Sequence, residues 1–161
     1  MSKDDWMTPK WLIERVRSFL GEIDLDPASS ELANTQVKAA KFYSEEESGL
    51  ENPWFGRIFL NPPYSQPLSN QFTEAFLELE FTAGILLCNF DSSTARCQAL
   101  LGNCSFCLLA KRIAFVDPET MQPVKGNRFG QALFYRGNRG AEFWTSFYDL
   151  GFSNGILRKE T

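Results

Sequence analysis

Histidine is absent from this 161-residue sequence, which removes histidine-based triads, histidine general bases and most catalytic zinc sites from consideration. No apolar run approaches the roughly 20 residues that a membrane helix needs. The start, Met-Ser-Lys-Asp-Asp, lacks the apolar segment of a signal peptide. We therefore expect a cytoplasmic protein without membrane contact. The length suits one domain, and 43% hydrophobic with 22% charged residues is a globular composition.

Cysteine occurs only at positions 88, 97, 104 and 107. Cys104 and Cys107 have zinc-knuckle spacing, but a second Cys-x-x-Cys pair is missing, as is histidine. Residues 105–110 are typical of a buried strand. Because free cysteine packs as a small hydrophobe, we interpret these residues as core thiols and expect no metal site.

Charge is unevenly distributed along the chain, although the net charge is only −4. Residues 1–95 carry 7 basic and 15 acidic groups, whereas residues 96–139 carry 7 basic and 2 acidic groups. A segregated basic segment is a candidate footprint for phosphate, although an ordinary solvated face gives the same pattern.

Strand and helix patterns alternate along the chain. Thr8 and Pro9 are suited to the N-cap and first position of a helix, and Ser69 to the cap of another. Strands are predicted at residues 23–27, 57–60, 83–88 and 105–111, with residues 113–116 and 131–135 forming a closing hairpin around a basic loop. This order predicts a single three-layer α/β domain over residues 1–161, with a mostly parallel sheet and an antiparallel C-terminal hairpin.

The most informative stretch is Asn61-Pro62-Pro63-Tyr64, which follows the apolar residues 57–60. Proline cannot donate to a sheet ladder, so the strand stops here and displays Asn61 and Tyr64 at its carboxyl end. In open α/β sheets, that edge is where ligands bind. Asn-Pro also opens simple turns, but a turn does not require two consecutive prolines between an amide and an aromatic ring.

This tetrapeptide suits the activation of an exocyclic aromatic amine. The lone pair of adenine N6 is delocalised into the ring, and acceptors on both amine hydrogens would free it for attack. The Asn61 side-chain oxygen and the Pro62 carbonyl are such acceptors, and proline aims them before the base arrives. Tyr64 offers a ring on which a base flipped out of the duplex can stack.

The electrophile would be a methyl sulfonium, whose donor needs carboxylates, an apolar wall and anion-binding N–H groups. Asp24 and Asp26 share one side of a predicted strand that Pro27 ends. Helix N-termini near Thr8 or Ser29 could bind the donor's own carboxylate. Solvated turn residues are the alternative for both aspartates. Trp6 is either a hydrophobic staple or part of a ligand wall.

Several segments resemble, in order and spacing, the phage-type DNA N6-adenine methyltransferases of the class I S-adenosylmethionine fold. They are Asp5-Trp6-Met7-Thr8-Pro9, residues 23–29, Gly49-Leu50 with Trp54, Leu60-Asn61-Pro62-Pro63-Tyr64-Ser65, and the stretches 111–115 and 130–133. The resemblance implies a minimal Rossmann-like methyltransferase domain that uses S-adenosyl-L-methionine.

The resemblance also implies roles for single residues. The catalytic loop would be Asn61, Pro62, Pro63 and Tyr64, and the cofactor pocket would be lined by Trp6, Thr8, Pro9, Asp24, Asp26, Pro27, Ala28 and Ser29. The sequence departs from the family pattern in three places. Gly-x-Gly is missing after the first strand, Ser48 stands where the family has an acidic residue, and Asn89 stands where it has proline.

Only 33 residues separate Pro27 from Asn61, which leaves no room for a target-recognition domain between them. Sequence readout of double-stranded DNA must then come from loops. This predicts a short or relaxed recognition sequence, or help from a partner protein. The candidate DNA contacts are Ser65, Gln66, Lys111, Arg112, Lys125 and Arg128. Alternatives left open are methylation of cytosine N4, of RNA or of protein amides, and a non-catalytic nucleic-acid-binding remnant. The oligomeric state, homodimer included, is also open.

Overall fold

The computed structural model describes residues 3–154, and the ends of the predicted domain, residues 1–2 and 155–161, lie outside the described residues. The helices are η1 (Lys3–Asp5), α1 (Lys10–Leu20), α2 (Glu31–Val37), α3 (Leu68–Glu78), α4 (Ala95–Asn103), α5 (Gly140–Phe147) and η2 (Tyr148–Leu150). The strands are β1 (Leu25–Asp26), β2 (Lys41–Phe42), β3 (Arg57–Leu60), β4 (Ala83–Asn89), β5 (Ser105–Leu109), β6 (Gln131–Arg136) and β7 (Gly151–Asn154). None of the helices in this part of the chain is long and apolar enough to cross a membrane.

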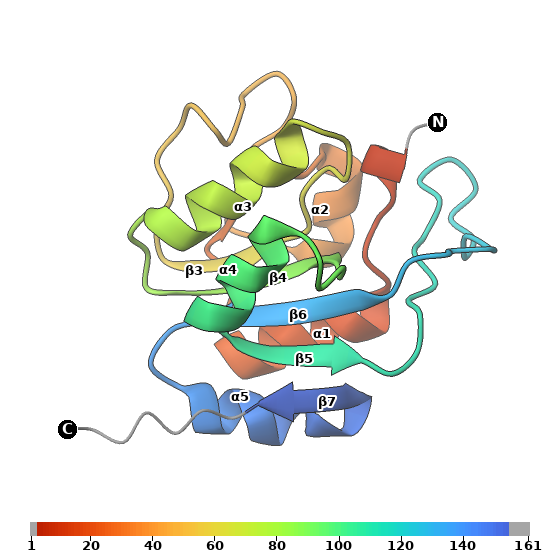
Figure 1. The fold of residues 1–161 in the computed structure, drawn as a ribbon. Helices are drawn as coiled ribbons and strands as arrows, with labels where there is room; N and C mark the ends of the chain where they lie inside the picture. The colour runs from red at the N-terminus through yellow and green to blue at the C-terminus, as the bar shows by residue number, and fades with distance from the viewer. Residues whose placement is uncertain (1–2, 155–161) are drawn as a thin grey trace.

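These strands form one mixed sheet in the order β2-β1-β3-β4-β6-β5-β7 (Figure 1). The first four strands of that order are parallel to one another. β6 then runs antiparallel to both β4 and β5, and β7 runs antiparallel to β5. The sheet is therefore parallel in its first part and antiparallel at its C-terminal part, an α/β arrangement compatible with a Rossmann-like fold.

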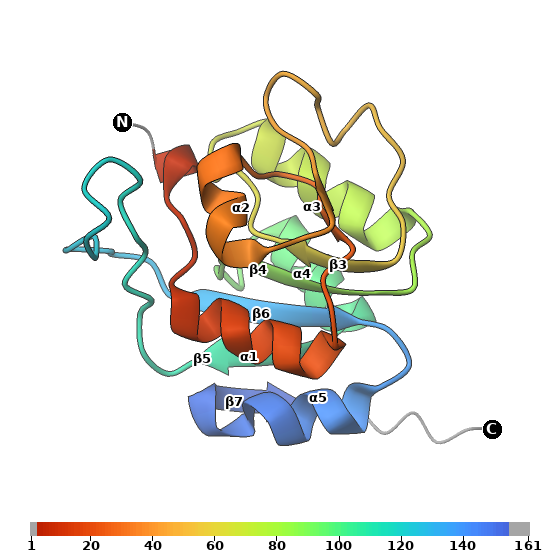
Figure 2. The ribbon, with the colours of Figure 1, turned by 180° about the vertical axis from the view of Figure 1, so that it is seen from behind.

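Side chains of the central strands alternate between two apolar clusters. On β4, Ile85 and Leu87 belong to one cluster, and Leu86 and Cys88 belong to the other. This period of two is that of a strand with both faces buried, as the continuous apolar run in β4 predicts. Figures 1 and 2 show α1 and α5 covering one face of the sheet and α3 and α4 covering the other.

The predicted pairing of residues 113–116 with 131–135 is wrong. Both edges of β6 are already taken, by β4 on one side and β5 on the other, so no free edge remains for residues 113–116. Ile113 and Phe115 instead bury their side chains in the first cluster, and Val116 makes isolated bridges to Met7 and Pro123. The antiparallel hairpin is β5–β6, and residues 110–130 form the loop between its strands.

The C-terminal strand β7 was not predicted, because Phe152 is its only large apolar residue. The segment becomes a strand because it pairs with β5. The two backbones lie so close that a Cβ on Gly151 would be 1.9 Å from the Leu108 carbonyl oxygen. In α5, Phe143 and Phe147 are buried, but Trp144 between them faces outward. Its ring is 43% exposed and stacks on Tyr148.

Candidate active site

The loops after β1 and β3 flank the point where the strand order reverses. β1 pairs with β2 on one side and with β3 on the other, so the chain moves outward from β1 and then returns across it. α2, which follows β1, contacts α1 on one face of the sheet, whereas Phe72 and Phe76 of α3, which follows β3, join the cluster on the other face. In open α/β sheets, ligands bind at such a reversal, outside the carboxyl ends of the strands. We use the word crevice for this edge of the sheet, at the ends of β1 and β3. We call residues 61–65 the proline loop and residues 26–29 the β1 turn.

Both ends of the Asn61 carboxamide are hydrogen-bonded. Its Nδ2 donates to the Thr8 Oγ1 at 3.1 Å and to the Trp6 carbonyl oxygen at 3.5 Å. Its Oδ1 accepts from the Tyr64 hydroxyl at 2.7 Å. The side chain that the sequence singles out is therefore oriented by contacts on both sides.

Tyr64 is held against the hydrophobic cluster that contains Phe115. The two rings are edge-to-face, with centroids 5.9 Å apart. Burial raises the pKa of the Tyr64 phenol well above its ordinary value. The hydroxyl therefore stays protonated at neutral pH and remains a donor to Asn61.

Thr8 is buried and does not cap α1. That helix begins at Lys10, and its N-cap is Pro9, which makes no side-chain capping bond. The predicted cap at Thr8 is therefore wrong, because its hydroxyl bonds Asn61 instead. The predicted cap at Ser69 is wrong for a similar reason. Ser69 lies inside α3, and its hydroxyl accepts from Arg96.

Asp4 is a site residue that the sequence reasoning missed. Its Oδ1 accepts from the backbone N–H of Tyr64 at 2.7 Å and of Ser65 at 2.9 Å, and its Oδ2 accepts from the Ser65 hydroxyl. A signal was present in the sequence. Pro62 and Pro63 end the ladder, so the next N–H groups need acceptors from elsewhere.

On the other side of the crevice, Asp26 is a buried carboxyl at the end of β1. Its Oδ1 accepts from the Ala28 N–H at 3.2 Å, which closes the turn around Pro27. Burial raises the pKa of Asp26 to about 7, which hydrogen bonds from Ala28 and Ser29 offset only in part. A buried carboxyl of this kind is suited to a cationic or hydroxyl-bearing ligand, whose charge or donor would favour its ionised form.

The β1 turn packs tightly against the loop that carries Gly49. A Cβ on Gly49 would lie 2.0 Å from the Pro27 carbonyl oxygen, so only glycine fits. The Trp54 indole donates to the Gly49 carbonyl oxygen at 2.7 Å. The Gly-Leu and Trp elements of the sequence pattern therefore support the turn after β1.

Asp24 lies at the opposite end of the sheet from Asn61. Its carboxylate accepts from the backbone N–H and the Nε of Arg57, at 2.7 and 2.9 Å. The side-chain hydrogen bond from Arg57 is the main cause of the lowered pKa of Asp24. Arg57 is the first residue of β3 and Asn61 follows the last, so the structure does not bring Asp24 together with the proline loop.

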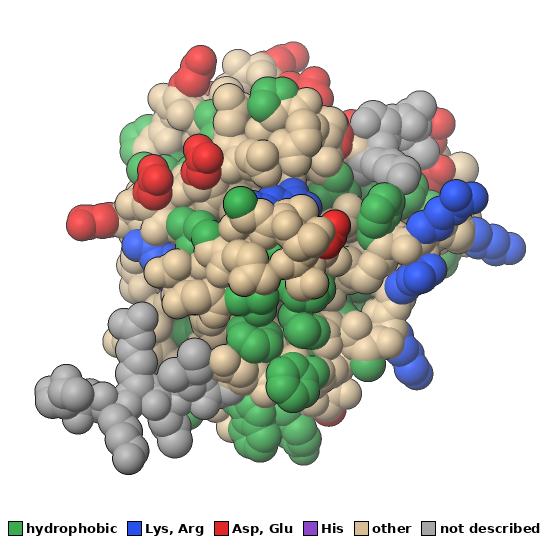
Figure 3. All heavy atoms as spheres, in the orientation of Figure 1, with side chains coloured by type: hydrophobic (Ala, Val, Ile, Leu, Met, Phe, Trp, Pro, Cys, Tyr) green, Lys and Arg blue, Asp and Glu red, His purple; other side chains and the backbone are tan. Residues whose placement is uncertain are grey.

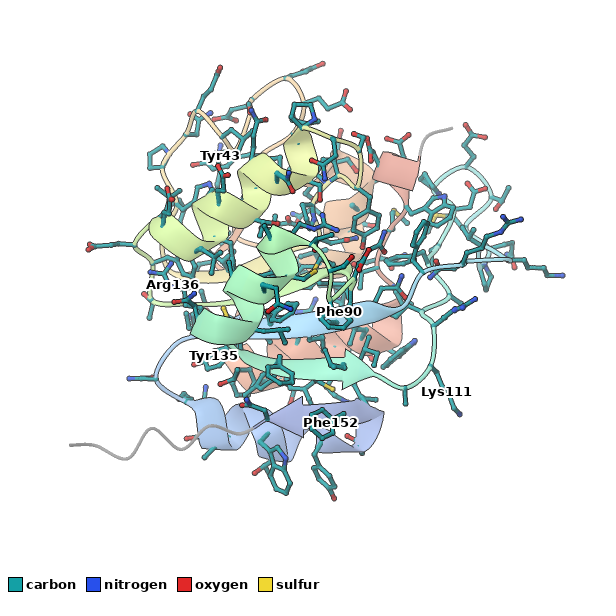
Figure 4. The ribbon with its side chains drawn as sticks, viewed as in Figure 1. Tyr43, Phe90, Lys111, Tyr135, Arg136 and Phe152 are labelled. Atoms are coloured by element: carbon teal, nitrogen blue, oxygen red, sulfur yellow. The ribbon has the colours of Figure 1, made fainter. Side chains whose placement is uncertain are left out.

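Residues 110–130, which we call the basic loop, carry exposed cations at the carboxyl edge of the sheet. Lys111, Arg112, Lys125 and Arg128 are all exposed. Basic side chains gather on this side in Figure 3, and Figure 4 shows Lys111 at the start of the loop, directed outward. Of these four cations, Arg112 also donates to the Asn127 carbonyl oxygen at 3.3 Å, within the same loop. The cations of the basic segment outside the loop bond elsewhere in the fold, namely Arg96 to Ser69, Arg136 to Phe76 and Leu79, and Arg139 to Glu142 and Phe19.

Side-chain amides fix the base of the basic loop. The buried Gln131 donates to Asn89 Oδ1 at 3.0 Å and accepts from Asn127 Nδ2 at 3.1 Å and the Ile113 N–H at 3.2 Å. Met7 bridges the loop at Val116. The loop is thus tied to both the sheet and the N-terminal segment beside Asn61.

The protein-family model for DNA N-6-adenine-methyltransferase (Dam) matches residues 1–145. The chain belongs to this family. The DNA N-6-adenine-methyltransferase of Escherichia phage T1 is 31% identical to it in an alignment 153 residues long. The match covers 82% of this chain and 62% of the phage protein. The chain thus spans less than two thirds of that relative's length. The resemblance inferred from the sequence motifs is confirmed.

Two positions at which this Dam-family chain departs from the pattern have local explanations. Ser48 accepts from the Leu50 N–H at 3.2 Å, so its hydroxyl serves the same loop that Gly49 joins to Pro27. Asn89 anchors Gln131, as described above. Both replacements hold backbone segments near the crevice.

The four cysteines are buried and free, as predicted. Cys107 belongs to the cluster with α1 and α5, and Cys104 to the cluster with α3 and α4. Across residues 3–154, no group of three or more histidine, cysteine or acidic side chains could hold a metal ion.

Of the remaining candidate DNA contacts, Gln66 is exposed, and its side-chain amide donates to Asn70.

Proposed function

We propose that the chain transfers a methyl group from S-adenosyl-L-methionine to the N6 amine of adenine in double-stranded DNA. The observation that carries this proposal is the Asn61 carboxamide, held by Thr8 with its oxygen facing a phenolic donor at the crevice. Membership of the Dam family supports the substrate class. A domain of this size would be the minimal, three-layer Rossmann-like form of such an enzyme.

The contact between Tyr64 and Asn61 suggests how a flipped adenine enters the site. The amine N–H of the base would replace the phenol as the donor to Asn61 Oδ1, and its second N–H would bond the Pro62 carbonyl. The displaced Tyr64 ring would then be available to stack on the base. Both acceptors are aimed before the base arrives, so little reorganisation accompanies the reaction.

Such acceptors draw the amine toward tetrahedral geometry and free its lone pair for attack. The nitrogen–methyl bond forms as the carbon–sulfur bond breaks, and the protonated amine then releases one proton. Asn61, Pro62 or water can take that proton in passing, so a dedicated base is not required.

The β1 turn fits the proposed cofactor. Asp26, which is buried and has its pKa raised to about 7, would accept from the amino group or the ribose hydroxyls of the cofactor. Residues Pro27, Ala28 and Ser29 would line the pocket, with Trp6 and Pro9 on the N-terminal side. When bound, S-adenosyl-L-methionine supplies an electrophilic methyl group on a positively charged sulfur. We do not include Asp24 in this pocket, because Arg57 engages it at the amino end of the strands.

The basic loop would contact the DNA backbone through Lys111, Arg112, Lys125 and Arg128, and the turn at Ser65 and Gln66 would lie next to the flipped base. Phosphate contacts of this kind position a protein without reading sequence. Target readout would therefore be short. An enzyme with this substrate would act in the cytoplasm, which is that of the host cell if a phage encodes the chain.

The test is methyl transfer from labelled S-adenosyl-L-methionine to an unmethylated duplex, followed by nucleoside analysis. The expected product is N6-methyldeoxyadenosine. If the product is N4-methyldeoxycytidine instead, the substrate is cytosine and not adenine. A protein that binds duplex DNA but gives no calorimetric signal with millimolar cofactor would be a binding remnant, and the proposal would fail.

A further inference from the structure

The N-terminal segment of residues 4–8, which we call the N-terminal strap, contacts the proline loop at both of its ends. Thr8 and the Trp6 carbonyl accept from the Asn61 side chain at the start of the loop. Asp4 accepts from Tyr64 and Ser65 at its end. The strap is itself attached to the basic loop through the bridge between Met7 and Val116.

The contacts at Asn61 select one orientation of its carboxamide. A carbonyl oxygen can only accept, so the Trp6 carbonyl requires that the amide nitrogen, not the oxygen, face the strap. The shorter bond, to the buried Thr8 hydroxyl, then holds the nitrogen in this place. A hydroxyl can accept or donate, so the Trp6 carbonyl sets the orientation and Thr8 supplies the closer contact. With the nitrogen held there, Oδ1 is left to face the opposite direction, where Tyr64 now donates to it.

The contacts at Asp4 fix the backbone on the other side of the prolines. Pro62 and Pro63 carry no N–H, so the first N–H groups after Asn61 are those of Tyr64 and Ser65. A single carboxylate accepts from both. Hydrogen bonds to an ionised acceptor are about twice as strong as neutral ones, and this pair resists any turning of the loop.

We propose that Thr8 and Asp4 are positioning residues for methyl transfer. Thr8 holds the Asn61 carboxamide so that its oxygen faces the target amine, and Asp4 holds the loop backbone that carries Asn61 and Tyr64. The proposal rests on the function proposed above. It also gives Thr8 a different role from the cofactor contact that the family resemblance implies, since its hydroxyl is directed to Asn61.

The decisive experiment compares Thr8→Val, which keeps the shape but removes the hydroxyl, with Thr8→Ser, which restores it. Thr145→Val is the matched control, because Thr145 is exposed on α5 and its hydroxyl bonds only its own helix, at Ala141. For Thr8→Val, we expect kcat to fall about tenfold, the equivalent of one lost hydrogen bond. The Kd for S-adenosyl-L-methionine should stay within about twofold, and Thr8→Ser should recover most of kcat.

A weakened cofactor Kd with unchanged kcat at saturating cofactor would assign Thr8 to the cofactor pocket and overturn the proposal. An equal loss of kcat in Thr8→Val and Thr8→Ser, with a lowered melting temperature, would show that Thr8 has only a structural role. That result would also overturn the proposal. If the wild-type chain transfers no methyl group, the proposed function fails instead, and the two failures are distinguishable.

Asp4 is tested with Asp4→Ala against Glu80→Ala, an exposed acidic control that follows α3. We expect kcat to fall about tenfold for Asp4→Ala and to stay unchanged for Glu80→Ala. A readout independent of activity is hydrogen exchange at the Tyr64 and Ser65 amides, measured without cofactor. Both amides should lose protection in Asp4→Ala. Unchanged protection would show that Asp4 does not hold the loop.

Discussion

The two sides of the crevice are built by opposite means. The proline loop after β3 is held by side chains from another segment, so Asn61 has a hydrogen-bond partner on each side. The β1 turn closes on itself through Asp26 and Ala28 and keeps a buried carboxyl whose pKa is raised to about 7. On the first side, hydrogen bonds orient the Asn61 carboxamide before any ligand binds. On the second side, the Asp26 carboxyl is buried, and a cationic ligand would stabilise its ionised form. This difference suits one side to the reacting amine and the other to a charged cofactor.

The largest expected effect separates the two sides directly. Asn61→Ala removes the acceptor for the target amine, and we expect kcat to fall on the order of 100-fold or more. Cofactor affinity, measured by calorimetry, should change by less than about twofold, because Asn61 lies on the other side of the crevice. Loss of both together would show that the two sides form one binding unit.

The basic loop tests whether DNA binding is separate from both sides. Lys125→Ala and Arg128→Ala should each weaken duplex binding severalfold and lower the salt dependence of log Kd by about 1. Lys41→Ala removes an exposed lysine of β2 that pairs with Glu47, and we expect it to leave both quantities unchanged. Equal effects of all three variants would mean that net charge, and not this loop, determines binding.

The pH dependence of stability tests the raised pKa of Asp26. Its pKa rises from an ordinary 3.8 to about 7 in the folded chain, so between those values the native state holds a proton that the unfolded chain has released. The free energy of unfolding should therefore fall as pH rises from about 4 to 7, by an amount on the order of 4 kcal/mol. Asp26→Asn should abolish this slope in denaturant titrations at several pH values.

Cofactor binding should reverse the shift at Asp26, because a cation or donor beside the carboxylate favours its ionised form. We expect proton release on binding at pH 6.5, seen as a buffer-dependent calorimetric enthalpy. At pH 8, Asp26→Asn should raise the cofactor Kd about tenfold. If binding releases no proton and the variant binds normally, Asp26 lies outside the cofactor pocket.

Removal of the Tyr64 hydroxyl gives the smallest expected effect. Tyr64→Phe removes the hydroxyl that occupies Asn61 Oδ1 but keeps the ring, so kcat should stay within about threefold of wild type. Tyr64→Ala removes the stacking surface and should cost about tenfold or more. Equal losses in both variants would give the hydroxyl, not the ring, the main role.

The sequence pattern was sufficient for the proline loop, because prolines after an apolar strand announce its end without reference to the rest of the fold. It also placed the buried run of β4 correctly. It failed at residues 113–116, whose alternation is that of a strand. Whether such a segment pairs depends on which sheet edges are free, and that is a property of the whole topology.

Asp4 and Asp24 illustrate the same limit in the site. An acidic residue near the N-terminus has no local feature that connects it to a loop 60 residues away, yet it accepts two of that loop's N–H groups. Asp24 and Asp26 lie next to each other on one side of the predicted strand and share a residue type, but Arg57 binds the first and burial raises the pKa of the second. Spacing alone placed both in one pocket, because it carries no information about which partner each carboxylate meets.

The position of β6 has a consequence for synthesis of the chain. β6 lies between β4 and β5 although it is made after both, so β5 has no neighbour in the first part of the sheet until residues 131–136 have left the ribosome. A nascent chain that ends before that point leaves one edge of β4 open, with its apolar residues uncovered. Unpaired edges of this kind favour aggregation. Pairing of β6 with β4 and β5 therefore determines whether the part of the sheet made earlier is protected from aggregation.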